Sequence, residues 1–383
     1  MFIVALKMLT GDRAKYISLI LGVAFSSLLI VQQASIFASV IRLSSYLVQS
    51  NPEVDIWVMR PGVEGATFID QLPEIRLSQV RGVAGVQWAA PFYQSATTVR
   101  TVDEKHSTYT QLEVRGIDDS SLIGRPREML LGTVENLRQN NAVILDIAAF
   151  KKLFPSLEPQ TGVEIEIGHK RVIVVGICRA PRTITGGDIL YARRSVALQL
   201  TQEVNNTISF ILVHINPGED KNVIAGRISN QTKLYAQTDA SFTRSIAKWV
   251  LDNTGVAEVL GAVIVLGVVV GILVVGQTFY MFANDNRLHF AALKAMGAGN
   301  FMIYKMLAVQ GVLVSFVGFG MGLGVATFIL RSMDRDLSPM RGITLSPAVA
   351  VVTAIALPII VLITVIISAR KVLQQDPSIV FRA

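Results

Sequence analysis

The chain has 383 residues, of which 51% are hydrophobic and only 16% are charged, with a mean hydropathy of +0.49 and a formal net charge of +7. The charged fraction lies well below the roughly 25% of ordinary soluble domains, which excludes a purely soluble protein. The basic residues are scattered, which excludes a nucleic-acid-binding protein, and the single cysteine, Cys178, excludes an intrachain disulfide and a cysteine-based metal cluster.

Four uncharged apolar runs predict four transmembrane helices. They are Ile17–Ile41, Val259–Asn284, Met306–Leu330 and Gly342–Ala369. Each is longer than the roughly 20 residues that a helix needs to cross a bilayer. The first run is also longer than the apolar core of a cleavable secretion signal, and Lys7, Arg13 and Lys15 precede it. It therefore predicts an uncleaved membrane anchor.

Four crossings place both termini on the same side, and the distribution of Lys and Arg indicates which side. Nine such residues lie on the side of the termini (7, 13, 15, 287, 294, 305, 370, 371 and 382) and seven on the other (42, 60, 244, 248, 331, 335 and 341). Because cytoplasmic segments carry the excess of positive charge, both termini are expected in the cytoplasm of a bacterial cell, with the chain in the cytoplasmic (inner) membrane. The predicted segments are a cytoplasmic amphipathic N-terminus (1–16), helix 1 (17–41), an extracytoplasmic domain (42–258), helix 2 (259–284), a cytoplasmic helix and loop (285–305), helix 3 (306–330), a short outer loop (331–341), helix 4 (342–369) and a cytoplasmic tail (370–383).

The long segment between the first two runs predicts a large α+β domain. Strands are expected at Val54–Met59 and Ile208–Ile215, and Gly162–Ile177 is typical of two strands joined by a turn at Gly168–Lys170. Helices are expected around Leu77–Val83, Asp146–Phe154 and Lys221–Thr232, with Asp146 as the N-cap of the second.

No motif in the chain predicts catalysis or metal binding. The four histidines form no HExxH, and Ser245-Ile-Ala-Lys248 has no K-T-G to accompany it, so neither a zinc enzyme nor a penicillin-interacting serine enzyme is indicated. Gly186-Gly187-Asp188 is interpreted as a turn. The phosphate-binding pattern G-x-x-x-x-G-K-[ST] is absent, so no cofactor is expected in this chain and ATP hydrolysis is not expected from it.

Small and amide residues within the runs predict helix packing in the membrane. Glycines four residues apart allow close approach of helix backbones, and amides in hydrocarbon seek partners on other helices. The spacing leaves open whether these residues pack within one chain or form a dimer contact; for the glutamines a contact between two copies is the favoured interpretation. The residues concerned are Gln32, Gln33, Gly267, Gly271, Gly318, Gly320, Gly322 and Gly324.

The segment between the second and third runs predicts a short amphipathic helix over Asn286–Met296, ended by Gly297 and Gly299. Arg287 and Lys294 share one face of it, while Leu288, Ala292 and Ala295 share another. The pattern alone also fits a connector that only covers lipid headgroups.

Two motifs resemble those of FtsX-like ABC transporter permeases. The segment from Arg287 to Ala298, RLHFAALKAMGA, resembles the family's R-x-E-[IF]-A-x-L-[KR]-A-[ML]-G-A pattern, with His289 where the family often has an acidic residue. The segment around Asp376-Pro377 is similar to the family's D-P-x-x-A-L-R tail. Inside the long domain, the segments at 114–118, 142–146 and 172–176 follow the order of MacB-like extracytoplasmic domains, so the chain is most similar to MacB-like and DevC-like permeases.

The resemblance implies a permease subunit that works as a homodimer with a separate ABC ATPase, which would bind the ATP and Mg²⁺. It implies that the connector is a coupling helix, with a set of residues at the ATPase: Arg287, Leu288, Ala291, Ala292, Lys294, Ala295, Met296, Gly297, Asp376 and Pro377. The expected activity is mechanotransmission to the outer domain for export of a lipid, peptide or hydrophobic substrate. A periplasmic adaptor protein and an outer-membrane channel are implied as partners only in a Gram-negative source. The alternative is an FtsX-like regulator that transmits ATPase cycling to a cell-wall hydrolase.

Overall fold

The computed structural model describes residues 13–63, 70–101, 109–181, 187–202, 206–335, 337–338 and 340–373. The chain divides into two compact units. The first is helical and contains residues up to Ser39, residues 256–333 and residues from 343 onward. The second is an α/β domain built from residues 40–255, which also includes the short segment 334–342.

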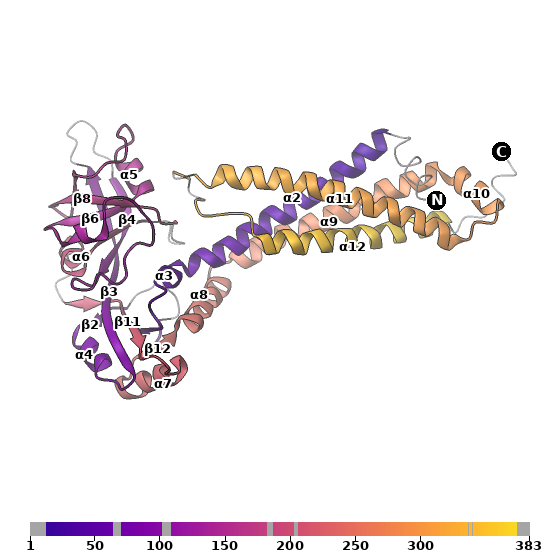
Figure 1. The fold of residues 1–383 in the computed structure, drawn as a ribbon. Helices are drawn as coiled ribbons and strands as arrows, with labels where there is room; N and C mark the ends of the chain where they lie inside the picture. Colours follow the sequence, from indigo (N-terminus) through magenta and orange to yellow (C-terminus); the bar gives the residue numbers. More distant parts are fainter. Residues whose placement is uncertain are drawn as a thin grey trace. The chain divides into compact units, whose positions relative to one another are not determined.

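Among the described residues, the helical unit contains four helices that are long and apolar enough to cross a membrane (Figure 1). They are α2 (Arg13–Ser44), α9 (Val256–Asp285), α11 (Asn300–Met333) and α12 (Pro347–Leu373). Only 17–33% of the most apolar window of each helix is buried within the chain. The remaining apolar surface needs lipid or another chain to cover it, because no polar face accompanies it. The prediction of four membrane helices is confirmed.

The core of this unit lies where α9, α11 and α12 meet. Phe279 and Phe282 of α9 pack edge to face, with their ring centroids 6.5 Å apart. Val314 of α11 and Val361 of α12 are buried in the same cluster, to which α2 adds Val23. Shape complementarity between these side chains is what holds the bundle together, since the hydrophobic effect contributes little between helices in lipid.

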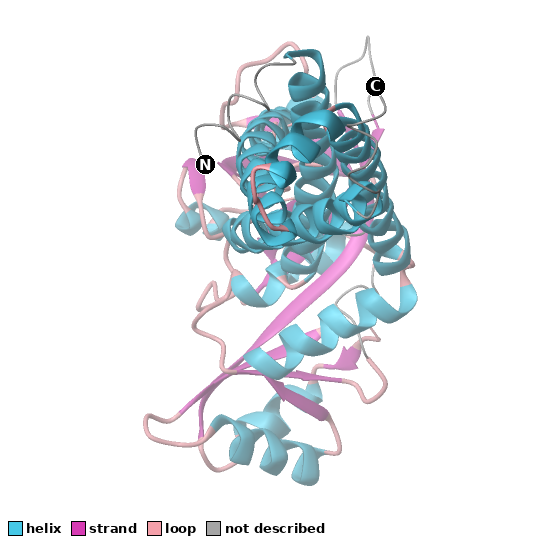
Figure 2. Ribbon diagram, turned by 90° about the vertical axis from the view of Figure 1, so that its right-hand side faces the viewer, coloured by secondary structure: helices cyan, strands magenta, loops and turns pink. Residues whose placement is uncertain are grey.

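The α/β domain is built on a ten-stranded sheet with the strand order β12-β1-β11-β3-β4-β9-β6-β8-β5, while β7 pairs with β3 and β8. A two-stranded sheet, β10-β2, accompanies it. The strands are β1 (Ile56–Met59), β2 (Leu72–Pro73), β3 (Val86–Thr101), β4 (Tyr109–Ile117), β5 (Met129–Leu131), β6 (Ala142–Asp146), β7 (Val163–Ile167), β8 (Lys170–Cys178), β9 (Asp188–Arg193), β10 (Thr207–Ile208), β11 (Phe210–Ile215) and β12 (Tyr235–Thr238). The long strand β3 pairs with β11 at its start and with β4 further on, so it joins the two parts of the sheet (Figure 2).

Helices cover both parts of the sheet. They are α3 (Tyr46–Gln49), α4 (Ile75–Arg81), the 3-10 helix Val134–Arg138, α5 (Ile147–Leu153), α6 (Arg194–Leu200), α7 (Lys221–Thr232) and α8 (Asp239–Asn253). Alternation along β1 shows how one part is filled. Ile56 and Val58 pack in the cluster that contains α4 and α7, whereas Trp57 and Met59 pack in the cluster that contains Phe242 of α8. Side chains of a strand point alternately to its two faces, so both faces of β1 are covered.

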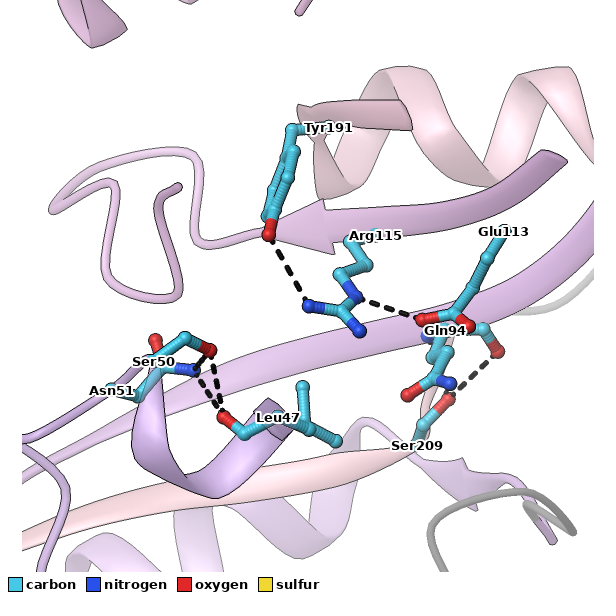
Figure 3. Close-up of polar contacts among 8 residues, drawn as sticks. All are labelled: Leu47, Ser50, Asn51, Gln94, Glu113, Arg115, Tyr191 and Ser209. Carbon is cyan, nitrogen blue, oxygen red and sulfur yellow. Dashed lines mark hydrogen bonds and ion pairs between the residues drawn. The ribbon is translucent and has the colours of Figure 1, made fainter. Parts of the chain in front are cut away.

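Several predicted elements agree with the structure. The hairpin expected in Gly162–Ile177 is β7 and β8, and α7 spans the predicted Lys221–Thr232. The strand expected over Ile208–Ile215 is divided at Ser209, whose backbone N–H bonds the Phe92 carbonyl at 2.8 Å. The Ser209 hydroxyl accepts from the Gln94 N–H at 2.9 Å and donates to the Gln94 carbonyl at 3.2 Å, so it replaces part of the ladder (Figure 3).

A charged side chain lies inside the domain, and its neighbours account for it. Arg115 on β4 is 2% exposed, and its Nε donates to Glu113 Oε1 at 2.8 Å. Its Nη1 donates to the Tyr191 hydroxyl at 3.2 Å (Figure 3). Its guanidinium lies 5.9 Å from the centre of the Tyr46 ring. Burial raises the pKa of Tyr191. Tyr191 therefore stays neutral and can accept this hydrogen bond from Arg115.

Candidate functional site

The connector between α9 and α11 is a short helix, α10 (Arg287–Ala295). It follows α9 after the single residue Asn286 and ends in a Schellman motif. The Ala298 N–H donates to the Leu293 carbonyl at 3.0 Å, and the Gly297 N–H donates to the Lys294 carbonyl at 3.0 Å. Gly297 has φ +93°, a left-handed conformation that favours glycine. The helix therefore stops at a fixed point, and α11 begins shortly after it.

Two opposite faces of α10 have different surroundings. Phe290 is 3% exposed and packs in the core of the bundle, with Leu293 beside it. Leu288 is 49% exposed and Met296 is 75% exposed, and Ala292 lies between them at four-residue spacing. Anchoring through Phe290 fixes the helix to the bundle, while the Leu288–Ala292–Met296 stripe stays open to a partner.

The residues that the sequence assigns to ATPase coupling are distributed as follows. Six of them lie on α10 (Arg287, Leu288, Ala291, Ala292, Lys294 and Ala295), and Met296 and Gly297 follow it directly. Asp376 and Pro377 lie outside the described residues. Phe290, the anchor, was not predicted from the sequence, although its three-residue spacing from Leu293 was a usable signal.

The glycine pairs of the membrane helices divide into two groups. A Cβ on Gly322 of α11 would lie 2.4 Å from the Ala24 carbonyl oxygen, and one on Gly318 would lie 2.7 Å from Val23 Cβ. On α9, a Cβ on Gly271 would lie 2.4 Å from Ser26 Oγ, and Ser26 Oγ donates to the Gly267 carbonyl at 3.0 Å. These four glycines therefore let α9 and α11 approach α2 within the same chain.

The other group of small and amide residues has no such contact within the described chain. A Cβ on Gly320 or Gly324 would meet no atom within 4 Å. Gln32 and Gln33 of α2 are half-buried, and neither amide forms a hydrogen bond with another described residue. These four residues are open to contact with a lipid or with a second copy of the chain.

A buried ion-pair cluster of the α/β domain was not predicted from the sequence. The Arg341 guanidinium pairs with Asp146 through Nη2 and Oδ2, and its Nη2 lies 3.8 Å from Asp188 Oδ1. Lys152 Nζ pairs with Asp188 Oδ2 at 2.5 Å. Asp146 is 0%, Asp188 2% and Arg341 6% exposed. Burial raises the pKa of Asp146 to about 6, and the charge of Arg341 opposes this rise.

Two sequence interpretations need correction at this cluster. Asp146 occupies the N-cap position of α5, but its side chain makes no capping hydrogen bond. Its Oδ1 instead accepts from the Ala180 N–H at 3.3 Å, and its Oδ2 is taken by Arg341. Asp188, expected in a turn, begins β9. A capping residue and a buried ion-pair acceptor look alike in sequence, because both are an Asp before a helix.

Matches to family models cover both units of the chain. Residues 17–231 match the model described as MacB-like periplasmic core domain, and residues 261–377 match the model described as FtsX-like permease C-terminal. Four membrane helices and these two matches define a multi-pass membrane protein of the ABC transporter permease class. The chain belongs to the FtsX-like/MacB-like permease family, as its motifs indicated.

Curated relatives carry the same description. Uncharacterized ABC transporter permeases from Mycobacterium tuberculosis and Mycobacterium bovis are each 24% identical over 336 residues, which cover 86% of this chain and 84% of theirs. These relatives are described as permeases, and ABC permeases are generally non-catalytic.

Solved structures of outer domains also match. The extracellular domain of the noncanonic ABC-type transporter YknZ from Gram-positive bacteria is 17% identical, with a TM-score of 0.36, over 48% of this chain and 98% of that one. The periplasmic region of MacB from Actinobacillus actinomycetemcomitans is 16% identical, with a TM-score of 0.38, over 51% of this chain and 93% of that one.

Proposed function

We propose that this permease couples ATP hydrolysis by a separate ABC ATPase to a conformational change of its α/β domain. The coupled change drives extrusion of a lipid, peptide or hydrophobic substrate that is already outside the cytoplasmic membrane. The working form is a homodimer with two ATPase subunits, and ATP and Mg²⁺ bind to those subunits. The observation that carries the proposal is α10, a short helix fixed at one face and apolar and exposed at the other.

The geometry of α10 suits a lever between an ATPase and the bundle. A force on the exposed stripe passes to Phe290, which is buried in the same cluster as residues of α9, α11 and α12. The exposed stripe offers small and flexible side chains, Ala292 and Met296, which fit closely into a groove. Arg287 and Lys294 add positive charge to the same helix, so an acidic groove is the complementary surface.

Co-purification in detergent tests the proposal. The chain is expressed with the ABC ATPase encoded beside its gene, as wild type and as Leu288→Asp/Met296→Asp. The ATPase is expected to co-purify with the wild type and to be reduced at least tenfold with the double variant, because two desolvated carboxylates oppose docking. Arg287→Glu/Lys294→Glu is expected to weaken the complex in a salt-dependent way.

Ile75→Asp is the matched control. Ile75 lies on α4 of the α/β domain and is 66% exposed, similar to Met296. This variant is expected to retain the ATPase. Retention of the ATPase by the double variant, or its absence from the wild type, would contradict the proposed function.

A further inference from the structure

The loop between α11 and α12 belongs to the α/β domain. Residues 334–342 join the compact unit formed by residues 40–255, whereas α11 ends at Met333 and α12 begins at Pro347 in the helical unit. Local hydrogen bonds hold the loop in this place. The Gly342 N–H donates to Asp334 Oδ1 at 2.9 Å, and Arg42 Nη2 donates to the Gly342 carbonyl at 2.9 Å.

Gly342 itself permits this close seating of the loop. Its φ is +87°, and a Cβ there would lie 3.1 Å from both Leu43 Cδ2 and Pro181 Cβ. A residue with a side chain would be strained in conformation and crowded against both neighbours. The backbone beside Arg341 therefore lies close against Leu43 and Pro181 of the domain.

Arg341 fixes the loop to the middle of the domain. Its charge lies against Asp146, at the end of β6, and near Asp188, at the start of β9. These two strands are antiparallel neighbours within the sheet, so the arginine is held by the sheet itself and not by a surface loop. With Lys152 beside Asp188, the cluster pairs two cations with two carboxylates; Asp146, Asp188 and Arg341 are buried, whereas the Lys152 side chain is 32% exposed.

A buried ion pair is poorly explained by stability alone. Apolar residues of similar size often replace such pairs without loss, while removal of one partner leaves an uncompensated buried charge. The cluster thus adds little net stability to the domain. What it provides is a contact that resists separation, because pulling Arg341 away would leave the buried Asp146 carboxylate without its ion-pair partner and Asp188 with Lys152 only.

We propose that Arg341 is the residue through which α11 and α12 move the α/β domain. By chain connectivity, the domain is joined to the helical unit through α2 and through the start of α9. Docking of Arg341 on Asp146 and Asp188 adds the loop, so all four helices are attached. Arg341 is a positioning residue, and the inference rests on the proposed function.

The test measures a distance between the two α/β domains of the reconstituted complex. Cys178 is replaced (Cys178→Ala), and a single spin label is placed at Ile75→Cys, which is exposed and remote in sequence from the cluster. Electron–electron dipolar spectroscopy compares the complex with its ATPase before and after trapping with ATP and vanadate. A shift in the distance distribution is expected for the wild-type loop, and Arg341→Ala and Asp146→Asn should each at least halve it while ATP hydrolysis continues.

Two further variants separate a mechanical role from a structural one. Arg335→Ala is the matched control, because Arg335 is an exposed arginine of the same loop, and it is expected to leave the shift unchanged. Insertion of a four-residue Gly-Ser segment after Met333 and another after Ile343 keeps Arg341 and its partners. It makes the links from the loop to α11 and α12 flexible. It is expected to reduce the shift as Arg341→Ala does, with an unchanged unfolding temperature.

The outcomes are distinguishable. A wild-type shift that persists in Arg341→Ala and in the insertion variant would overturn the inference and leave the proposed function intact. Absence of a dipolar signal, or of any shift, in the wild-type complex would overturn the proposed function and the inference with it.

Discussion

Gly322→Ala is expected to destabilise the helical unit. The added Cβ would lie 2.4 Å from the Ala24 carbonyl oxygen and 2.7 Å from Ser27 Cβ. The Ala24 carbonyl oxygen belongs to the backbone of α2, so it cannot rotate away. Helices α2 and α11 must therefore move apart to relieve the contact. Overpacking of this kind costs about 1–3 kcal/mol. Since alanine otherwise favours a helix by about 1 kcal/mol over glycine, the net loss should be about 0–2 kcal/mol, and the variant should be about 1–3 kcal/mol less stable than one with alanine at an uncrowded glycine of the same helix.

Thermal unfolding of the full chain in a mild detergent measures this loss, with Gly324→Ala as the control. Gly324 lies two residues further along the same helix, and a Cβ there would meet no atom within 4 Å. The control is expected to unfold at or slightly above the wild-type temperature. Equal changes in unfolding free energy from both substitutions would refute the assignment of Gly322 to an intrachain contact with α2.

Three further predictions concern anchors and titratable groups. Phe290→Ala should cost about 3–5 kcal/mol in detergent unfolding, because the ring is 3% exposed, whereas His289→Ala on the exposed face should change little. The pKa of Asp146 is raised to about 6, so the folded state binds its proton more tightly, and this group's contribution to stability falls as the pH rises from about 4 to 6. In Asp146→Asn this pH dependence of the unfolding free energy, which amounts to at most about 3 kcal/mol between pH 4 and 6, should be lost. An unchanged pH profile would contradict the raised pKa. Cys178 is fully buried and its pKa is raised by burial, so N-ethylmaleimide at pH 8 should leave the native chain unlabelled and add one group after denaturation. Rapid native labelling would show that the thiol is accessible.

The sequence predicts the elements whose signals are local. Four apolar runs specify the membrane helices, because length and the absence of charge suffice in a bilayer. Gly168 and His169 specify the β7–β8 turn, where both have positive φ. Asp220 caps α7 through the Asn222 and Val223 N–H groups, which explains why that helix begins where its sequence indicates.

The parts that the sequence does not predict depend on contacts between distant segments. Asp146 and Arg341 are 195 residues apart, and no periodicity links them. The same holds for the glycines of α11, where spacing alone gives two equivalent pairs. Only the position of α2 distinguishes Gly318 and Gly322, which are covered, from Gly320 and Gly324, which are not.

Helix α10 shows both cases. Its range and its glycine terminator were predicted from propensity and capping, which act within one turn. Its buried face was not, because Phe290 is 3% exposed within a cluster whose other members come from distant helices of the chain. The sequence predicts one apolar face with Leu288 and Ala292 on it. In the structure these two residues lie on the exposed stripe, and the buried face is the one that carries Phe290.

Site-specific photo-crosslinking tests the central claim most directly. A photoreactive amino acid replaces Met296 in one form of the chain and Ile75 in another, since both positions are exposed, and each form is irradiated with its ABC ATPase in native membranes. Position 296 is predicted to crosslink to the ATPase and position 75 is not. Crosslinking from position 75, or none from position 296 while the two proteins co-purify, would show that α10 is not the ATPase contact.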